Sequence, residues 1–472
     1  MASAGKDRRP RWRHALAVTA AMTLAATGLL GARSAAHAEP YTPAHAGPSP
    51  LNPYAGGPGY VDPGWAANVE ASAVAEGGAT ADRMRRLAKV PTAVWLDRIA
   101  KVTGGPGADR TLRDHLDAAL RQRARHITFV VYDLPDRNCA NPASAGELSI
   151  VSGGLARYKA EYIDPMAEIL RLPAYRNLRV ALVVEPHSLA DLAVTTGVPT
   201  IDCQLERASG AYVDGVRYAL DKLGASPNVR LYLDAGSAPL MGYEPYSTPF
   251  AELVTSTVRG TSRGLSGVRG FATGVAEYVP LDEVFMPDPR ATVNGGPLWT
   301  SRFFDWNPVF DERDHATALR AALIARGFPA AIRVIIDTSR NGWGGPDRPT
   351  AAGTSAQLDT YVDQSRIDRR SYRFNYCNQK GAGLGERPRA EPAAGIDAYV
   401  WIKPPGESDG VSVPPIHDED DPHNRYDVMC DPTRYGRIDP DEPTGALPGA
   451  PPAGLWHHAQ FSMLVANAHP AL

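Results

Sequence analysis

The chain has 472 residues and is 43% hydrophobic by composition, which is enough to bury a large core in one large or two medium domains. Its 49 Lys and Arg residues nearly balance 52 Asp and Glu residues, and the formal net charge is −3. This balance argues against nucleic acid or an anionic membrane surface as the partner, because both attract strongly basic proteins.

The first 38 residues have the pattern of a secretory signal peptide. Basic residues precede an apolar run over residues 15–32, and Ala36-His37-Ala38 provides a small-x-small cleavage site. A membrane anchor is the alternative, since the run has nearly the length needed to span a bilayer, but its Ala, Thr and Gly content favours the signal. We therefore expect a secreted, extracellular protein with no membrane association after signal cleavage.

Residues 39–63 follow as a leader that is rich in Pro and Gly and has no periodicity. Such a composition predicts a flexible or surface-hugging segment. No internal repeat or second linker interrupts the rest of the sequence, so residues 64–472 are predicted to form a single large domain.

Within this domain, short runs rich in β-branched residues alternate with amphipathic segments. The runs predict strands at residues 127–134, 179–185, 229–236, 270–278, 332–339 and 398–404. Helical patterns lie between them, at residues 146–153 continuing into 158–170, at 210–224 and at 315–327. Strands this apolar are buried on both faces, which predicts a parallel sheet covered by helices.

The predicted strands end in residues that look like site residues rather than plain turns. In parallel β/α barrels the functional groups gather at the carboxyl ends of the strands. The residues at these ends are Tyr132, His187, Asp234, Arg340 and Lys403. We expect them to surround one site.

The densest group of charges is in the sequence WIKPPGESDG, residues 401–410. Its Pro/Gly loop places Lys403 near Glu407 and Asp409, which suits a polar, hydroxyl-rich ligand; a solvated charged loop is the alternative. Aromatic residues favour a sugar ligand, because flat rings stack on the apolar faces of sugars, although each one taken singly is more often part of the core. They lie in or beside polar stretches at Trp95, Tyr132, Trp306, Trp343, Tyr376 and Trp401.

Four cysteines fit an oxidising compartment and allow three pairings. We expect two disulfides between sequence neighbours, Cys139 with Cys203 and Cys377 with Cys430. No CxxC motif occurs and the lone histidines lack ligand spacing, so neither a metal nor a cofactor is predicted.

Six stretches together resemble glycoside hydrolase family 6, the secreted cellulases that include cellobiohydrolases and endoglucanases. They are VVYDLPDRNCANPASAGE, ALVVEPHSLADL, YLDAG, DTSRNGWGGP, NYCNQKGAGLGERP and VWIKPPGESDG, in the expected order over about residues 50–472. The resemblance implies a distorted parallel β/α barrel of TIM-like type, a tunnel or cleft over the strand ends, and inverting hydrolysis of β-1,4-glucan. The family's two disulfides match the expected pairing.

The resemblance assigns roles on one side of the site completely. Asp409 matches the proposed base. Trp95 and Asp97 match the wall of a glycone subsite, and Tyr132 matches the residue beneath the distorted sugar at the cleavage point. The other positions that match sugar-binding or neighbouring polar residues are Arg137, Ser144, Lys403 and Glu407.

The leaving-group side departs from the family's pattern. His187 stands where an EPDSL motif has the proton-donating aspartate, and Asn138 stands where an RDC motif has the carboxylate that supports this acid. The sequence DAGHAGWLGW of relatives is DAGSAPLMGY here, so Ser237 replaces a histidine and Leu240 replaces a stacking tryptophan. Tyr376 replaces the tryptophan of an NWCN motif, which is a milder change.

Inverting hydrolysis needs one carboxylic acid to protonate the leaving oxygen and one carboxylate to activate water. An imidazolium with an ordinary pKa of about 6.5 could donate this proton at mildly acidic pH, and Asp234 could hold His187 charged. Three hypotheses stay open: an efficient histidine acid, a weak or altered hydrolase, and a non-hydrolytic carbohydrate-binding protein of the same fold. In each case we expect a monomer whose partner is a β-glucan polysaccharide or oligosaccharide.

Overall fold

The computed structural model describes residues 51–194, 201–414, 426–436 and 440–472. The predicted signal peptide lies outside the described residues, and so does the predicted leader up to residue 50. Two leader residues that are described, Tyr54 and Tyr60, are buried. The Tyr60 backbone N–H donates to the His126 carbonyl at 2.9 Å, so this part of the leader packs against the first residue of a strand. Across the described ranges, no helix is both long and apolar enough to cross a bilayer.

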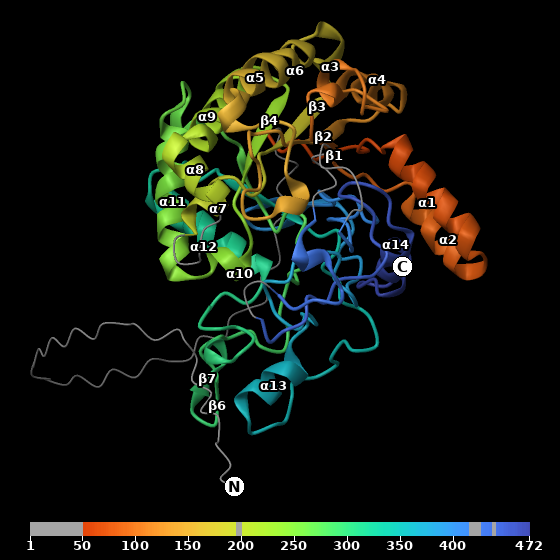
Figure 1. Cartoon of the computed structure of the whole chain (residues 1–472), viewed down its shortest axis with the longest axis vertical. Helices are drawn as coiled ribbons and strands as arrows, with labels where there is room; N and C mark the ends of the chain where they lie inside the picture. The colour runs from red at the N-terminus through yellow and green to blue at the C-terminus, as the bar shows by residue number, and fades with distance from the viewer. Residues whose placement is uncertain (1–50, 195–200, 415–425, 437–439) are drawn as a thin grey trace, which may run out of the picture. The chain divides into compact units, whose positions relative to one another are not determined.

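A sheet of eight strands organises the fold, in the order β1-β2-β3-β4-β5-β8-β10-β9 (Figure 1). Neighbouring strands are parallel except at the edge, where β9 runs antiparallel to β10. The strands are β1 Val94–Leu96, β2 His126–Val131, β3 Arg179–Val184, β4 Val229–Asp234, β5 Gly270–Thr273, β8 Arg333–Asp337, β9 Arg389–Ala393 and β10 Ile396–Val400. A separate hairpin pairs β6 Thr292–Val293 with β7 Gly296–Pro297. The predicted parallel β/α class is confirmed.

The sheet is curled, and its two sides meet near β1 and β10. The Ala93 backbone N–H, just before β1, donates to the carbonyl of Trp401, just after β10, at 2.9 Å. The Trp95 indole N–H donates to the Ile402 carbonyl, also at 2.9 Å. Because β1 and β10 are not neighbours in the sheet order, these bonds close the curl locally and give the distorted barrel that the resemblance implied.

Strand residues alternate between two buried faces. Val130, Val183 and Tyr232 pack with other inward-facing residues in the barrel interior, whereas Phe129 and Leu182 belong to the large core formed with the helices. Successive side chains of a strand point to opposite faces, so burial of both faces requires apolar residues at nearly every position. This double burial explains the continuous apolar runs in the sequence.

Most helices lie around the outer side of the strands, whereas α13 lies apart from the sheet near the β6–β7 hairpin (Figure 1). The helices are α1 Pro63–Glu76, α2 Gly78–Leu87, α3 Ala100–Thr103, α4 Leu112–Arg121, α5 Gly154–Arg157, α6 Asp164–Leu170, α7 Leu189–Ala193, α8 Ile201–Ser209, α9 Ala211–Gly224, α10 Ala238–Met241, α11 Glu244–Arg259, α12 Glu312–Ala325, α13 Leu358–Ser365 and α14 His458–Ala466. The helices α9 and α12 confirm the patterns at residues 210–224 and 315–327. The pattern at 158–170 is only partly α-helical.

This irregular segment is a π-helical turn, Tyr158–Ile163, that precedes α6. The Tyr158 hydroxyl donates to the Glu185 carboxylate at 2.8 Å, directly after β3. The Tyr162 hydroxyl donates to the carbonyl of Leu96 in β1. The turn therefore ties the helical layer to the carboxyl ends of two strands, where the site lies.

Both predicted disulfides form. Cys139 pairs with Cys203 and Cys377 pairs with Cys430. The first bond fixes the loop after β2, which carries Asn138, and the second fixes the loop around Cys377, which carries Tyr376. Both loops carry residues of the predicted site.

Candidate active site

A cleft of about 570 Å³ opens over the carboxyl ends of the strands and contains most of the predicted site. Parallel strands bring residues far apart in sequence to this one edge of the sheet. The predicted residues that line it are Trp95, Asp97, Tyr132, Arg137, Asn138, Ser144, His187, Tyr376, Lys403, Glu407 and Asp409. The fold therefore brings these sequence-predicted residues together in one cleft.

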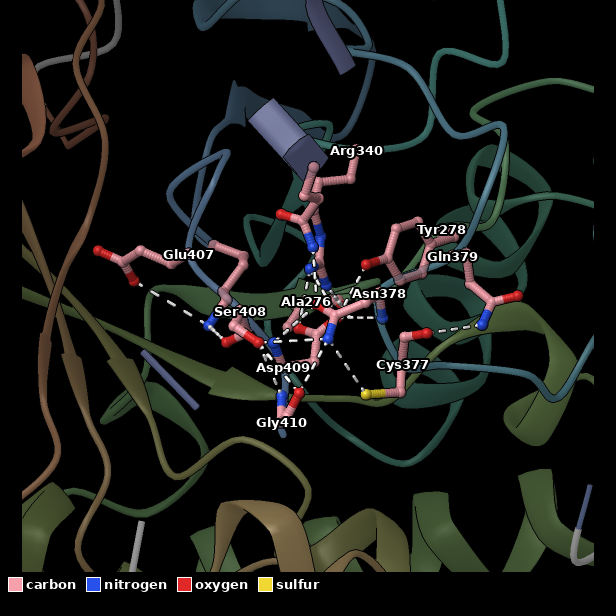
Figure 2. A network of polar contacts seen from close by, with 12 residues as sticks. Ala276, Tyr278, Arg340, Cys377, Asn378, Gln379, Glu407, Ser408, Asp409 and Gly410 are labelled. Atoms are coloured by element: carbon pink, nitrogen blue, oxygen red, sulfur yellow. Dashed lines mark hydrogen bonds and ion pairs between the residues drawn. The ribbon is translucent and has the colours of Figure 1, made fainter. Parts of the chain in front are cut away.

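Asp409 lies at the centre of a dense polar network (Figure 2). The Arg340 Nη1 group contacts both carboxylate oxygens at 2.8 Å. The Tyr278 hydroxyl and the Asn378 backbone N–H donate to Oδ2, at 2.7 Å and 2.8 Å. Since Oδ2 already accepts three hydrogen bonds and Oδ1 only one, Oδ1 is the oxygen with capacity to accept a proton from water.

Arg340 is completely buried, and two contacts besides Asp409 hold it. Its guanidinium lies 4.2 Å from the centre of the Tyr278 ring and donates to the Ala276 carbonyl. Burial lowers the pKa of Arg340, but Asp409 and Tyr278 outweigh that effect and raise it. The orientation of the Asp409 carboxylate is thus fixed before any ligand binds.

Lys403 and Glu407 form a polar edge beside the Trp95 ring. The Lys403 ammonium donates to the Ser408 carbonyl at 3.1 Å, lies 4.0 Å from the Glu407 carboxylate and lies 5.5 Å from the centre of the indole ring. Burial lowers the pKa of Lys403 and raises that of Glu407 to about 7. An aromatic face flanked by an ammonium and a carboxyl group suits a sugar ring and its hydroxyls.

Arg137 borders the cleft, but its contacts are mainly structural. Its guanidinium donates to backbone carbonyls, including those of Ser144 at 3.0 Å and Tyr132 at 2.5 Å, and also to the Asp97 carbonyl. It also lies 4.3 Å from the centre of the Tyr132 ring. Arg137 therefore holds the loops that present Tyr132, and its role toward a sugar would be indirect.

His187 lies at the end of β3 in a strained backbone segment. The backbone φ is 58° at His187 and 49° at Glu185. Both values lie in the left-handed region, which residues other than glycine rarely adopt. The His187 backbone N–H donates to Asp234 Oδ2 at 3.1 Å, at the end of the neighbouring strand β4. This contact fixes the backbone at His187, which lines the cleft.

Carboxylates around the His187 ring control its charge. Burial lowers the pKa of His187, but Asp234, Asp191 and Glu277 and a hydrogen bond with the Val275 carbonyl raise it above its ordinary value. Asp234, which we expected to hold His187 charged, is the largest of the influences that raise this pKa. The result is an imidazole that holds its proton to higher pH than a free histidine does.

Two of these carboxylates, Asp191 and Glu277, also line the cleft and were missed in the sequence. Glu277 follows β5 closely, so the strand-end rule could have identified it. Asp191 lies in α7 and offers no such signal. Asn138 is buried and hydrogen-bonds the hydroxyl of Tyr132.

Several candidates lie elsewhere. Ser237 does not border the cleft: it is only 2% exposed and precedes α10, and its carbonyl accepts the backbone N–H groups of Leu240 and Met241. Trp343 and Trp401 are fully buried in a core cluster. They therefore pack in the core, which was the alternative to a sugar-binding role for the aromatic residues. Trp306 is 62% exposed and is not among the residues that line the cleft. Leu240, in contrast, does line it.

One cluster of three potential metal ligands occurs among the residues that the structure describes: Cys139, Asp191 and Cys203. Its two sulfur atoms form a disulfide bond, so they offer no thiolate to a metal.

Comparison with known proteins identifies relatives over almost the whole described chain. Residues 54–468 match glycosyl hydrolases family 6. Exoglucanase A of Cellulomonas fimi is 44% identical over 432 residues, which cover 89% of this chain and 49% of that protein. A probable 1,4-β-D-glucan cellobiohydrolase C of Aspergillus niger is 36% identical, over 89% of this chain and 78% of that protein. The chain thus spans about half the length of the bacterial relative.

Solved structures agree with these relatives. The catalytic domain of Cellulomonas fimi Cel6B superimposes with a TM-score of 0.85 at 44% identity, covering 90% of this chain and 97% of that domain. The CcCel6A catalytic domain, complexed with p-nitrophenyl β-D-cellotrioside, gives a TM-score of 0.68 at 32% identity, covering 90% of this chain and 99% of that domain.

The Asp409 network predicts a large stability effect. Asp409→Ala would leave the buried Arg340 guanidinium without its counter-charge, so we expect the free energy of unfolding to fall by about 3–5 kcal/mol. The control is Glu70→Ala, which breaks an exposed pair with Arg85 and should cost about 1 kcal/mol or less. Guanidinium chloride unfolding measures both. Equal, small losses in the two variants would contradict the proposed structural role of the ion pair.

Proposed function

Because this chain belongs to glycosyl hydrolases family 6, we propose that it hydrolyses β-1,4-glucan, in cellulose or a related polysaccharide, by an inverting mechanism with a modified acid side. The observation that carries the proposal is that Asp409, His187 and the polar edge of Trp95, Lys403 and Glu407 line one cleft. The names of the relatives refer to 1,4-β-D-glucan and to a cellotrioside ligand, which supports a β-glucan as the substrate.

The polar edge formed by Trp95, Lys403 and Glu407, called the sugar-binding edge from here on, would hold the glycone. Trp95 would stack on a glucose ring, while Lys403 and Glu407 would bind its hydroxyls. Tyr132, held by Arg137 and Asn138, would lie at the cleavage point. This part of the site matches the family's pattern without substitution.

Asp409 would act as the base. In an inverting reaction, water attacks the anomeric carbon from the face opposite the leaving oxygen while a carboxylate takes the water's proton. Asp409 Oδ1 has the open acceptor capacity for this, and Arg340 keeps the carboxylate oriented. Preorganisation of this kind lowers the barrier because the group need not reorient during the reaction.

His187 would act as the acid. Its imidazolium would donate a proton to the glycosidic oxygen as the bond to the anomeric carbon breaks, which leaves a neutral sugar hydroxyl and a neutral imidazole. The carboxylates around the ring keep the proton available at mildly acidic and neutral pH. They also make the imidazolium a weaker acid, which supports the expectation of impaired or retuned catalysis.

The alternative is a carbohydrate-binding protein that does not hydrolyse its ligand. It is favoured by one observation: the substitutions at residues 138, 187 and 240 all lie on the leaving-group side, while the sugar-binding edge is intact. Binding without turnover needs only that edge.

The protein is further proposed to be secreted and to act outside the cell as a monomer. Two disulfides support an oxidising compartment. The predicted signal sequence, residues 1–38, supports export.

Restoring the two aspartates that relatives have at positions 138 and 187 tests the proposal that the acid side is modified. The double change His187→Asp with Asn138→Asp should raise the rate of cellohexaose hydrolysis by roughly 10²–10⁴-fold, the usual contribution of a general acid. Each single change serves as a control and should give less, because the two carboxyl groups act together. An unchanged rate in a folded, glucan-binding double variant would favour the non-hydrolytic alternative.

Separate roles for His187 and Asp409 predict different responses to an activated substrate. The wild-type rate should show a bell-shaped pH profile, whose alkaline limb reflects loss of the His187 proton. His187→Ala should remove that limb and most of the rate on cellohexaose. A cellotriosyl fluoride should restore turnover in His187→Ala, because fluoride leaves without protonation, but not in Asp409→Asn. If wild type and His187→Ala show the same rate and pH dependence, His187 has no part in catalysis.

A further inference from the structure

Three carboxyl groups from different elements act electrostatically on His187, and two of them, Asp191 and Glu277, line the same cleft. The three groups differ in which other residues balance their charge. Asp234, at the end of β4, accepts backbone N–H groups of His187 and Gly236, at 3.1 Å and 3.2 Å. Glu277, after β5, has the Arg370 guanidinium at 3.9 Å. Within the described residues, Asp191 forms no ion pair with a lysine or arginine. His187 is therefore the cation that Asp191 can balance.

Asp191 is well placed for this task. It lies in α7, the helix that begins two residues after His187, and it is only 9% exposed where it borders the cleft. Its carboxyl group accepts the Ala140 backbone N–H, and its Oδ2 lies 4.0 Å from Cys139 Sγ. The carboxyl group thus rests on the loop that carries Asn138, which has no charge of its own.

We propose that Asp191 is a positioning residue that supplies, from α7, the negative charge absent at Asn138 and so keeps His187 protonated for transfer to the leaving oxygen. Asp191 contacts the loop that carries Asn138 through Cys139 and Ala140, and the Cys139–Cys203 disulfide anchors this loop. This inference rests on the proposed function, in which His187 is the acid.

The pH range of the effect follows from the environment of Asp191. Burial raises its pKa to about 7, against the opposing influence of His187 and the Ala140 N–H. Its charge is therefore complete only above neutral pH. That is the range in which a histidine with an ordinary pKa of about 6.5 loses its proton. Asp191 should thus act on the alkaline limb of activity and have little influence at lower pH, where it is itself protonated.

NMR titration of the His187 imidazole in the full protein tests this directly, with the signal assigned by its loss in His187→Ala. Asp191→Asn should move the His187 midpoint to lower pH by roughly 1 pH unit, as expected for loss of one nearby opposite charge. The matched control is Asp214→Asn, which removes a 57% exposed carboxylate in the first turn of α9 and should leave the midpoint unchanged. Adding Asn138→Asp to Asp191→Asn should return the midpoint toward the wild-type value. An unchanged midpoint in Asp191→Asn overturns the proposal.

Rates on cellohexaose provide the second readout. Below about pH 6, the rate of Asp191→Asn should stay within about 3-fold of the wild-type rate. As the pH rises, Asp191→Asn should lose activity at a lower pH than wild type does. If Asp191→Asn instead abolishes turnover at every pH and a cellotriosyl fluoride restores it, Asp191 is itself the proton donor and the positioning role is wrong. If wild type cleaves neither substrate while the NMR midpoint still shifts, the proposed function fails and the pairing of Asp191 with His187 stands.

Discussion

The buried ion pair between Arg340 and Asp409 organises the site, because it joins the carboxyl ends of strands that are distant in sequence. Arg340 follows β8 and Asp409 follows β10, while Tyr278, which donates to the same carboxylate, follows β5. These three strands are neighbours in the sheet. A guanidinium with no exposed surface is costly unless a carboxylate faces it, so the pair fixes both the loops and the reactive oxygen.

The acid side is built on the other half of the sheet. Asn138, His187 and Asp234 follow β2, β3 and β4, which are also neighbours. The cleft therefore joins two groups of strands, one that carries the proposed base and one that carries the proposed acid. The substituted positions Asn138, His187 and Leu240 follow β2, β3 and β4, whereas the residues that contact Asp409 follow β5 and β8. Tyr376, the milder substitution, follows β8 and lies outside the group that carries the proposed acid.

The sequence predicted the features that repeat along the chain and missed those set by tertiary contacts. Continuous apolar runs identified six strands, and the strand-end rule placed the cleft. The three-residue β1 and the antiparallel edge strand β9 lack such runs, so they were not predicted. Ser237 was misassigned because a position within a motif does not reveal that the backbone turns away from the cleft. Asp191 was missed because only the folded loop at Asn138 brings its carboxyl group into the site.

We expect this cleft to cleave β-1,4-glucan with water attacking opposite the leaving group. Real-time ¹H NMR of cellohexaose digestion at mildly acidic pH tests it most directly, because the anomeric protons report both cleavage and the configuration of the first product. The account predicts that the α-anomer appears first and then equilibrates with the β-anomer. A β-anomer formed first, or cellohexaose that binds and stays intact, would contradict it.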